Sequence, residues 1–222
     1  MRTSPLFKSL AVAAVLSTVS VIAGQAQQLR QVAAFQKLRT SGACNVVLTK
    51  GTTTQVKVEA DSDVEKYIRT EVQNGTLMIY RDKDAPMQLF SNKKVTVYVT
   101  CPRLTGVETS GASDIKSEST FKADDFSIKA SGASDVTLRL DAQRLTVQAS
   151  GASDVRLSGH VERQQVQISG SSDYQASNLQ SRKADVQASG ASDAYVFVEE
   201  ELSARSSGAS DVRNKGKARV TR

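Results

Sequence analysis

The chain has 222 residues, of which 39% are hydrophobic and 5% aromatic, with no tryptophan and a formal net charge of +6. This length is enough to bury a sizeable core. The last ten residues hold five cations and no acid, and without them and the two cations before residue 26 the net charge is −1. The excess charge therefore does not describe a basic face, and nucleic-acid binding has little support.

Residues 1–26 have the pattern of a signal peptide. Arg2 and Lys8 give the charged start, the stretch from Leu10 to Ile22 is the apolar core, and Gly24-Gln25-Ala26 is a small-x-small cleavage site. The alternative is an uncleaved N-terminal anchor. No later apolar run is long enough to span a bilayer. We therefore expect an exported chain that is periplasmic, outer-membrane-associated or extracellular, with no transmembrane segment after cleavage.

After a polar leader at residues 27–34, we expect one domain over residues 35–222. Its first part, residues 35–107, is an irregular β-rich region that would cap the structure. Gln55–Glu59 and Val95–Val99 alternate as strands, and Asn74-Gly75 is typical of a hairpin turn. Ser62–Glu65 matches a capping box for a short helical turn.

Cys44 and Cys101 are the only cysteines. An oxidising compartment would permit a disulfide between them. Cys44 lies in a predicted bend, however, and Cys101 precedes Pro102 at a predicted strand end, and the sequence does not bring the two together. A disulfide and two separate buried thiols both remain open.

A five-residue phrase, Ser-Gly-Ala-Ser-Asp or a close variant, organises the rest of the chain. The six phrases begin at Ser110, Ser131, Ser150, Ser169, Ser189 and Ser207. Their starts lie 21, 19, 19, 20 and 18 residues apart. A near-constant period of this size marks a solenoid, in which each repeat is one coil. Ser41-Gly42-Ala43-Cys44-Asn45 is an earlier, imperfect copy.

The segments between the phrases alternate apolar and polar residues, as in Leu145–Ala149 and Val136–Leu140. Period two indicates strands with one buried face, and no helical period is present. The predicted fold is all-β: a right-handed parallel β-helix with its coils at residues 108–212. Residues 213–222 would form a basic tail that ends the last coil and frays.

Each phrase is predicted to be a bend, stacked on its copy one coil away at about 4.8 Å. The glycines would provide the sharp backbone turn; they are Gly111, Gly132, Gly151, Gly170, Gly190 and Gly208. The carboxylates would form a column of Asp114, Asp135, Asp154, Asp173, Asp193 and Asp211. Such a column needs compensation from backbone N–H groups, from cations two residues further on, or from bound Ca²⁺. We expect the first two, with the metal row as a lesser candidate.

Several of these features together resemble the putative auto-transporter adhesin, head GIN domain family of bacterial envelope proteins. The matching segments are Phe35 with Ser41-Gly42-Ala43, Gly75–Ile79, Val95–Leu104 and the run of phrases. One departure is Cys44-Asn45 in place of Ser-Asp. The resemblance implies an exported β-helical domain, and it carries over no catalytic residues.

The expected function is a non-catalytic envelope or surface module, an adhesin or structural interaction domain with a protein or glycan ligand. The alternative is a Ca²⁺-assisted polysaccharide lyase or hydrolase on the same scaffold, and a third hypothesis is a calcium-stabilised structural protein. His160, the only histidine, reads as an exposed turn residue. No catalytic residue and no cofactor are predicted.

Overall fold

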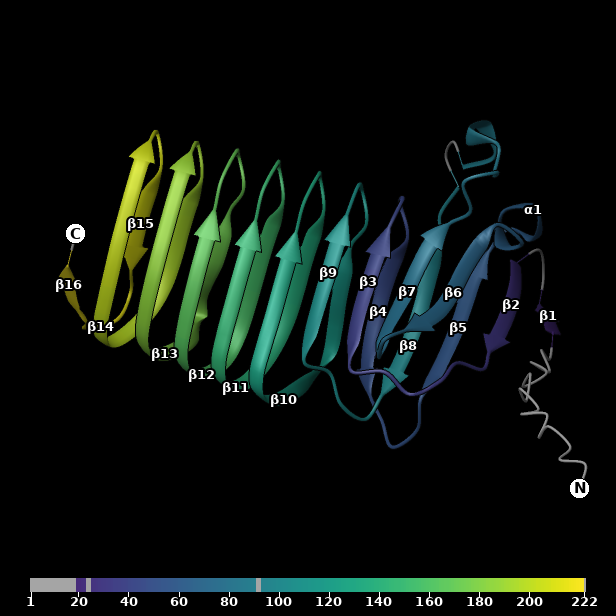
Figure 1. The fold of residues 1–222 in the computed structure, drawn as a ribbon, viewed down its shortest axis with the longest axis horizontal. Helices are drawn as coiled ribbons and strands as arrows, with labels where there is room; N and C mark the ends of the chain where they lie inside the picture. Colours follow the sequence, from purple (N-terminus) through teal and green to yellow (C-terminus); the bar gives the residue numbers. More distant parts are fainter. Residues whose placement is uncertain (1–18, 23–24, 91–92, 222) are drawn as a thin grey trace, which may run out of the picture.

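The computed structural model describes residues 19–22, 25–90 and 93–221. Figure 1 shows a ladder of stacked coils with a group of shorter strands at its N-terminal end. Strands dominate the described residues, which also contain one short α-helix and one 3-10 helix. Parallel pairing joins successive coils, so the predicted all-β solenoid is confirmed.

Each repeating strand begins at the last residue of one bend or directly after it, turns once, and ends directly before the next bend or at its glycine. These strands are β10 (Ile115–Ala130), β11 (Asp135–Ala149), β12 (Asp154–Ile168), β13 (Tyr174–Gly190) and β14 (Asp193–Gly208). The start of β10 pairs with β4 (Asn45–Lys50), whereas its end pairs with β9 (Gly106–Ser110), which in turn pairs with β3 (Lys37–Ser41). We call the segments that follow a bend the post-bend layer and the segments that precede a bend the pre-bend layer.

The coil is right-handed. In Figure 1 the chain rises through the nearer pre-bend layer, crosses at the bends along the top, and descends through the farther layer as it advances toward the C-terminus. This is the hand that right-twisted strands favour in parallel crossovers.

Period-two alternation places one side of every strand in a continuous core between the layers. In β11, Val136, Leu138 and Leu140 are buried while the residues between them are more exposed. Tyr174 is also fully buried, at a position that holds Val155 in the preceding coil and Ala194 in the next. Phe197 is only partly buried, and Lys215 lies over its ring.

The N-terminal region forms the cap. Its elements are β5 (Gln55–Ala60), α1 (Ser62–Glu65), β6 (Ile68–Gln73), β7 (Thr76–Arg81), η1 (Met87–Phe90) and β8 (Thr96–Cys101). β5 pairs antiparallel with β8, and β6 pairs antiparallel with β7. The hairpin turn has positive φ at Asn74 and Gly75, as predicted. The helical turn is also present, but Asp61 precedes it without a side-chain capping bond, so the predicted capping box does not form.

The order of strands in space differs from their order in the chain. β3 and β4 form the first coil. β7 pairs parallel with β3, and β8 pairs parallel with β4, so β7 and β8 form another coil against it. The chain then passes back along residues 102–105 to β9, on the other side of β3. Along this path the Thr105 N–H donates to the Gln36 carbonyl oxygen. The first coil is therefore enclosed on both sides by strands that follow it in sequence.

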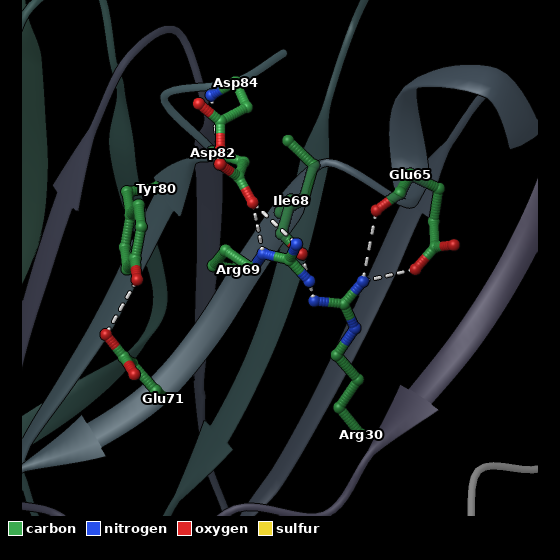
Figure 2. A network of polar contacts seen from close by, with 8 residues as sticks. All are labelled: Arg30, Glu65, Ile68, Arg69, Glu71, Tyr80, Asp82 and Asp84. Atoms are coloured by element: carbon green, nitrogen blue, oxygen red, sulfur yellow. Dashed lines mark hydrogen bonds and ion pairs between the residues drawn. The ribbon is translucent and has the colours of Figure 1, made fainter.

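An arginine near the N-terminus ties the cap together (Figure 2). Arg30 lies at the end of β2 (Gln25–Arg30), which pairs antiparallel with β5. Its guanidinium donates to the carbonyl oxygens of Glu65 and Ile68 and pairs with the Glu65 carboxylate. Arg69 forms a two-pronged pair with Asp82 close by. Part of the predicted leader is thus held by side-chain bonds.

Most of the predicted signal peptide, residues 1–18 and 23–24, lies outside the described residues. Of the remainder, β1 (Val19–Ile22) pairs antiparallel with β2.

The basic tail does not fray as the sequence led us to expect. β15 (Asp211–Asn214) and β16 (Arg219–Thr221) both pair parallel with β14. The backbone N–H groups of Lys215 and Ala218 donate to the carbonyl oxygens of Val196 and Val198. The described part of the tail therefore continues the ladder as an incomplete final coil, because backbone pairing does not depend on the charge of its side chains.

Candidate functional site

The bends stack directly on one another. Gly151 has φ 83°, and a Cβ there would lie 2.5 Å from the Gly132 carbonyl oxygen. The Ala152 N–H donates to that same oxygen at 2.7 Å, and equivalent bonds join the neighbouring bends. Only glycine combines this backbone angle with this close an approach.

The second serine points inward in five of the six phrases, which the sequence did not indicate. Ser113, Ser134, Ser153, Ser172 and Ser192 are all fully buried. The Ser153 hydroxyl donates to the Ser150 carbonyl oxygen, and the Ser153 N–H donates to the Ser172 hydroxyl of the next coil. Each buried hydroxyl is thus paired with backbone atoms, as a buried polar group must be. The signal that could have shown this was Cys44, a residue type that is usually buried, at the equivalent position.

The aspartates link neighbouring coils through the backbone. The Asp135 N–H donates to an Asp114 carboxylate oxygen at 3.2 Å. The same bond joins Asp193 to Asp173 at 3.3 Å and Asp211 to Asp193 at 3.2 Å. At Asp154 the N–H donates instead to the Ser134 carbonyl oxygen.

Cations two residues further along the chain balance part of this column. Arg156 contacts both Asp135 and Asp154, at 3.3 Å and 2.6 Å, and Arg213 pairs with Asp211 at 2.8 Å. These three ion pairs are the compensation that the alternating register makes possible. Across the described ranges, no group of three or more Asp, Glu, His or Cys side chains is arranged to hold a metal ion.

The two cysteines are buried and unpaired. Cys101 lies beside Lys50 at one end of β4, whereas Cys44 precedes the other end, five or more residues away along the strand. Burial raises the pKa of the Cys44 thiol to about 12 and that of Cys101 to about 11. Both thiols are therefore neutral in the folded protein at physiological pH, and neither is activated as a nucleophile.

A series of hydrogen-bonded polar side chains crosses the interior between coils. The Tyr174 hydroxyl donates to Gln164 at 2.7 Å, Gln164 donates to Ser181 at 2.7 Å, and Ser181 donates to the Phe197 carbonyl oxygen at 3.0 Å. Burial raises the pKa of Tyr174 well above its usual range. Because every member of the series has a partner, the network orients these side chains and leaves no free acid or base.

His160 is exposed, as predicted, with its Nε2 3.7 Å from the Glu162 carboxylate.

The pre-bend layer carries a long shallow groove of about 630 Å³. We call it the pre-bend groove. Equivalent residues of six successive coils line its floor: Glu108, Lys129, Gln148, Gln167, Gln187 and Arg205. The first serines of the phrases, from Ser131 to Ser207, line its upper edge. The groove therefore presents the same amide and hydroxyl groups repeatedly, at the spacing of the coils.

The stacked coils and repeated columns define a β-solenoid that presents extended polar faces. A family model described as "Putative auto-transporter adhesin, head GIN domain" matches residues 34–218, and the chain belongs to this family. The departure at Cys44 lies inside the matched region.

Solved structures of bacterial proteins share the fold. A putative adhesin from Bacteroides fragilis has 24% identity and a TM-score of 0.82, over 88% of this chain and 90% of that one. A putative lipid binding protein from Parabacteroides distasonis has 16% identity and a TM-score of 0.71, over 89% and 92%. A putative adhesin from the same species has 17% identity and a TM-score of 0.69, over 89% and 92%.

No curated protein matches the chain. None of the comparisons supports the lyase or hydrolase alternative. Among the residues that the structure describes, no helix has the length and apolar character needed to cross a membrane.

Proposed function

We propose that this protein is an exported, non-catalytic module of the cell envelope that attaches to a polar surface ligand along its pre-bend groove. The observation that carries the proposal is the repetition of one set of side chains along that groove. Gln148, Gln167 and Gln187 pair in register on neighbouring strands, so their amides recur once per coil. An amide both donates and accepts, so a row of them suits an extended polar ligand.

Export is supported by the pattern of residues 1–26 and by the family, whose description is that of an auto-transporter adhesin. Cleavage after Ala26 would remove β1 and leave Arg30 with its partners in the cap. We therefore expect the envelope fraction to contain a chain that begins at Gln27, which mass spectrometry of the intact protein would measure.

The attachment can be tested in a strain that lacks the protein and is complemented with variants. Wild type should restore attachment to surfaces, and a triple variant with Gln148→Ala, Gln167→Ala and Gln187→Ala should not. A matched triple variant with Gln143→Ala, Gln165→Ala and Gln180→Ala removes three exposed amides that do not line the groove, and it should behave as wild type.

Unchanged attachment and unchanged envelope integrity in the deletion strain would overturn the proposal. Equal attachment by the two triple variants would show that the ligand does not bind in the pre-bend groove.

A further inference from the structure

We propose that the post-bend layer carries a second binding site, a pocket for one unit of a neutral saccharide. The site lies where β12, β13 and β14 run out of register, and we call it the post-bend pocket. Its volume is about 600 Å³. The lining residues used in the argument are Arg156, Ser158, Asp173, Gln175, Asn178 and Tyr195. The pocket lies in the layer opposite the pre-bend groove, and the inference does not depend on that groove.

The solenoid departs from its own repeat at this place. β11 and β12 pair without a shift from Asp135 to Ala142. Between β12 and β13, Arg156 pairs with Gln175 but Ser158 pairs with Asn178, so β13 has one extra residue. Between β13 and β14, Gln175 pairs with Tyr195 and Gln180 with Phe197, so β14 has three residues fewer. A strand with an extra residue beside a shortened strand leaves the surface hollow.

Asp173 lacks the compensation found elsewhere in the aspartate column. An arginine pairs with each of Asp135, Asp154 and Asp211. The residue two positions after Asp173 is the uncharged Gln175. Within the described ranges, the Asp173 carboxylate accepts one hydrogen bond, from the Asp193 N–H at 3.3 Å, and forms no ion pair. Its remaining lone pairs can accept hydrogen bonds from two neighbouring hydroxyl groups of a sugar.

Tyr195 forms the wall of the pocket on the β14 side. The Arg213 guanidinium lies 5.5 Å from the centre of its ring, and the Tyr195 hydroxyl lies 3.4 Å from an Asp193 carboxylate oxygen. Both contacts restrict the movement of the ring at the edge of the pocket. The π face of an aromatic ring carries partial negative charge, so it packs well against the C–H face of a saccharide. The Gln175 and Asn178 amides can both donate to and accept from the ring hydroxyls.

The charges in the pocket favour a neutral ligand. A uronate would bring its carboxylate close to Asp173, and like charges at such separations repel. Arg156, the cation in the pocket, is already engaged by Asp135 and Asp154. A neutral hexose or N-acetylhexosamine meets no such repulsion.

The test is a nuclear magnetic resonance titration of the isotope-labelled protein. The probes are neutral tetrasaccharides of glucose, mannose, galactose and N-acetylglucosamine, with tetragalacturonate as the acidic comparison. At least one neutral probe should give saturating shifts that centre on β12–β14. Asp173→Asn and Tyr195→Ala should each weaken its binding by about tenfold or more, since each removes a principal contact. Tyr195→Phe, which keeps the ring, should bind within about threefold of wild type.

Asp114→Asn is the matched control. Asp114 accepts the same backbone hydrogen bond from the next coil but does not line the pocket. It should bind the saccharide as wild type does, and thermal melting of both Asp→Asn variants shows whether they fold alike. The triple variant of the pre-bend groove should also keep saccharide binding, which separates this site from the proposed attachment.

Absence of a saturating shift with every neutral probe would overturn the inference. So would equal binding by Asp173→Asn and Asp114→Asn, or tighter binding of tetragalacturonate than of any neutral probe.

Discussion

The cap and the coils share the same two layers but are built by different pairing. In the coils each residue lies over its own equivalent, as Gly151 does over Gly132. In the cap the edge strands run antiparallel, and a turn residue such as Gly75 has no equivalent above or below it. A side chain added at a coil glycine therefore meets the neighbouring coil, whereas one added at Gly75 meets no atom within 4 Å and is opposed by the backbone angle alone.

Substituting one glycine in each region would measure this difference most directly. Gly75 and Gly151 both have positive φ, at 71° and 83°. A Cβ at Gly75 meets nothing within 4 Å, but one at Gly151 overlaps backbone atoms of Gly132. We expect Gly75→Ala to lower the free energy of unfolding by about 1 kcal/mol and Gly151→Ala by about 4 kcal/mol, because overpacking adds to the backbone cost. Denaturant unfolding measures both, and equal losses would contradict the comparison.

Alkaline pH should weaken the N-terminal region before the later coils, because Cys44 lies in the first bend and Cys101 at the end of β8. The folded protein keeps the Cys44 thiol protonated up to its pKa of about 12, whereas the unfolded chain ionises it from about pH 8.5. This thiol therefore does not change the free energy of unfolding below about pH 8.5, and it lowers that free energy by about 1.4 kcal/mol per pH unit between about pH 8.5 and its folded pKa. Cys44→Ala should show a shallower fall between pH 9 and 11, which denaturant unfolding at each pH measures. An identical slope would contradict the assignment.

The buried second serines of the phrases should contribute more to the free energy of unfolding than the first serines do. Ser153→Ala removes a fully buried hydroxyl and should cost about 1–2 kcal/mol, because the Ser150 carbonyl oxygen loses the hydrogen bond that this hydroxyl donates. Ser150→Ala, at an exposed position in the same phrase, should change stability by less than about 0.5 kcal/mol. Thermal melting of the pair checks this. A larger loss from Ser150→Ala would mean that the inward column is not the one that binds the coils together.

The smallest effect should come from making the first phrase resemble the others. Cys44→Ser places a hydroxyl where the later phrases have one, and the Cys44 N–H already donates to the Ser113 hydroxyl. We expect a change within about 1 kcal/mol in the free energy of unfolding. A loss of several kcal/mol, seen in denaturant unfolding, would show that the first bend follows the rules of the cap and not those of the coils.

The sequence predicted the coils well because their information is repeated. The phrase spacing and the alternation in segments such as Val136–Leu140 are each stated several times in the chain. The sequence did not reveal that Ser153 and its equivalents point inward, because a serine reads as polar and its partners lie in another coil. The return of the chain to β9 was also hidden, since that path depends on contacts far apart in sequence.

The post-bend pocket was hidden for a related reason. It arises from small differences in length between β13 and β14. The sequence shows that the repeats differ in length, but it does not show where in each repeat the extra or missing residues lie. The sequence also did not predict the pairing of β15 and β16. The cations at residues 213–222 favoured a solvent-exposed tail, and no pattern in the sequence indicated that its backbone pairs with β14.

The rows of backbone hydrogen bonds between successive coils also determine how the molecule would unfold under mechanical force. A pull on the C-terminus along the stacking axis loads the last row of hydrogen bonds first, and each row that opens releases one coil of chain, about 60 Å when extended. The remaining coils stay folded, because each contacts only its neighbours. An anchored protein of this shape would lengthen in steps under shear and would keep its cap until the end.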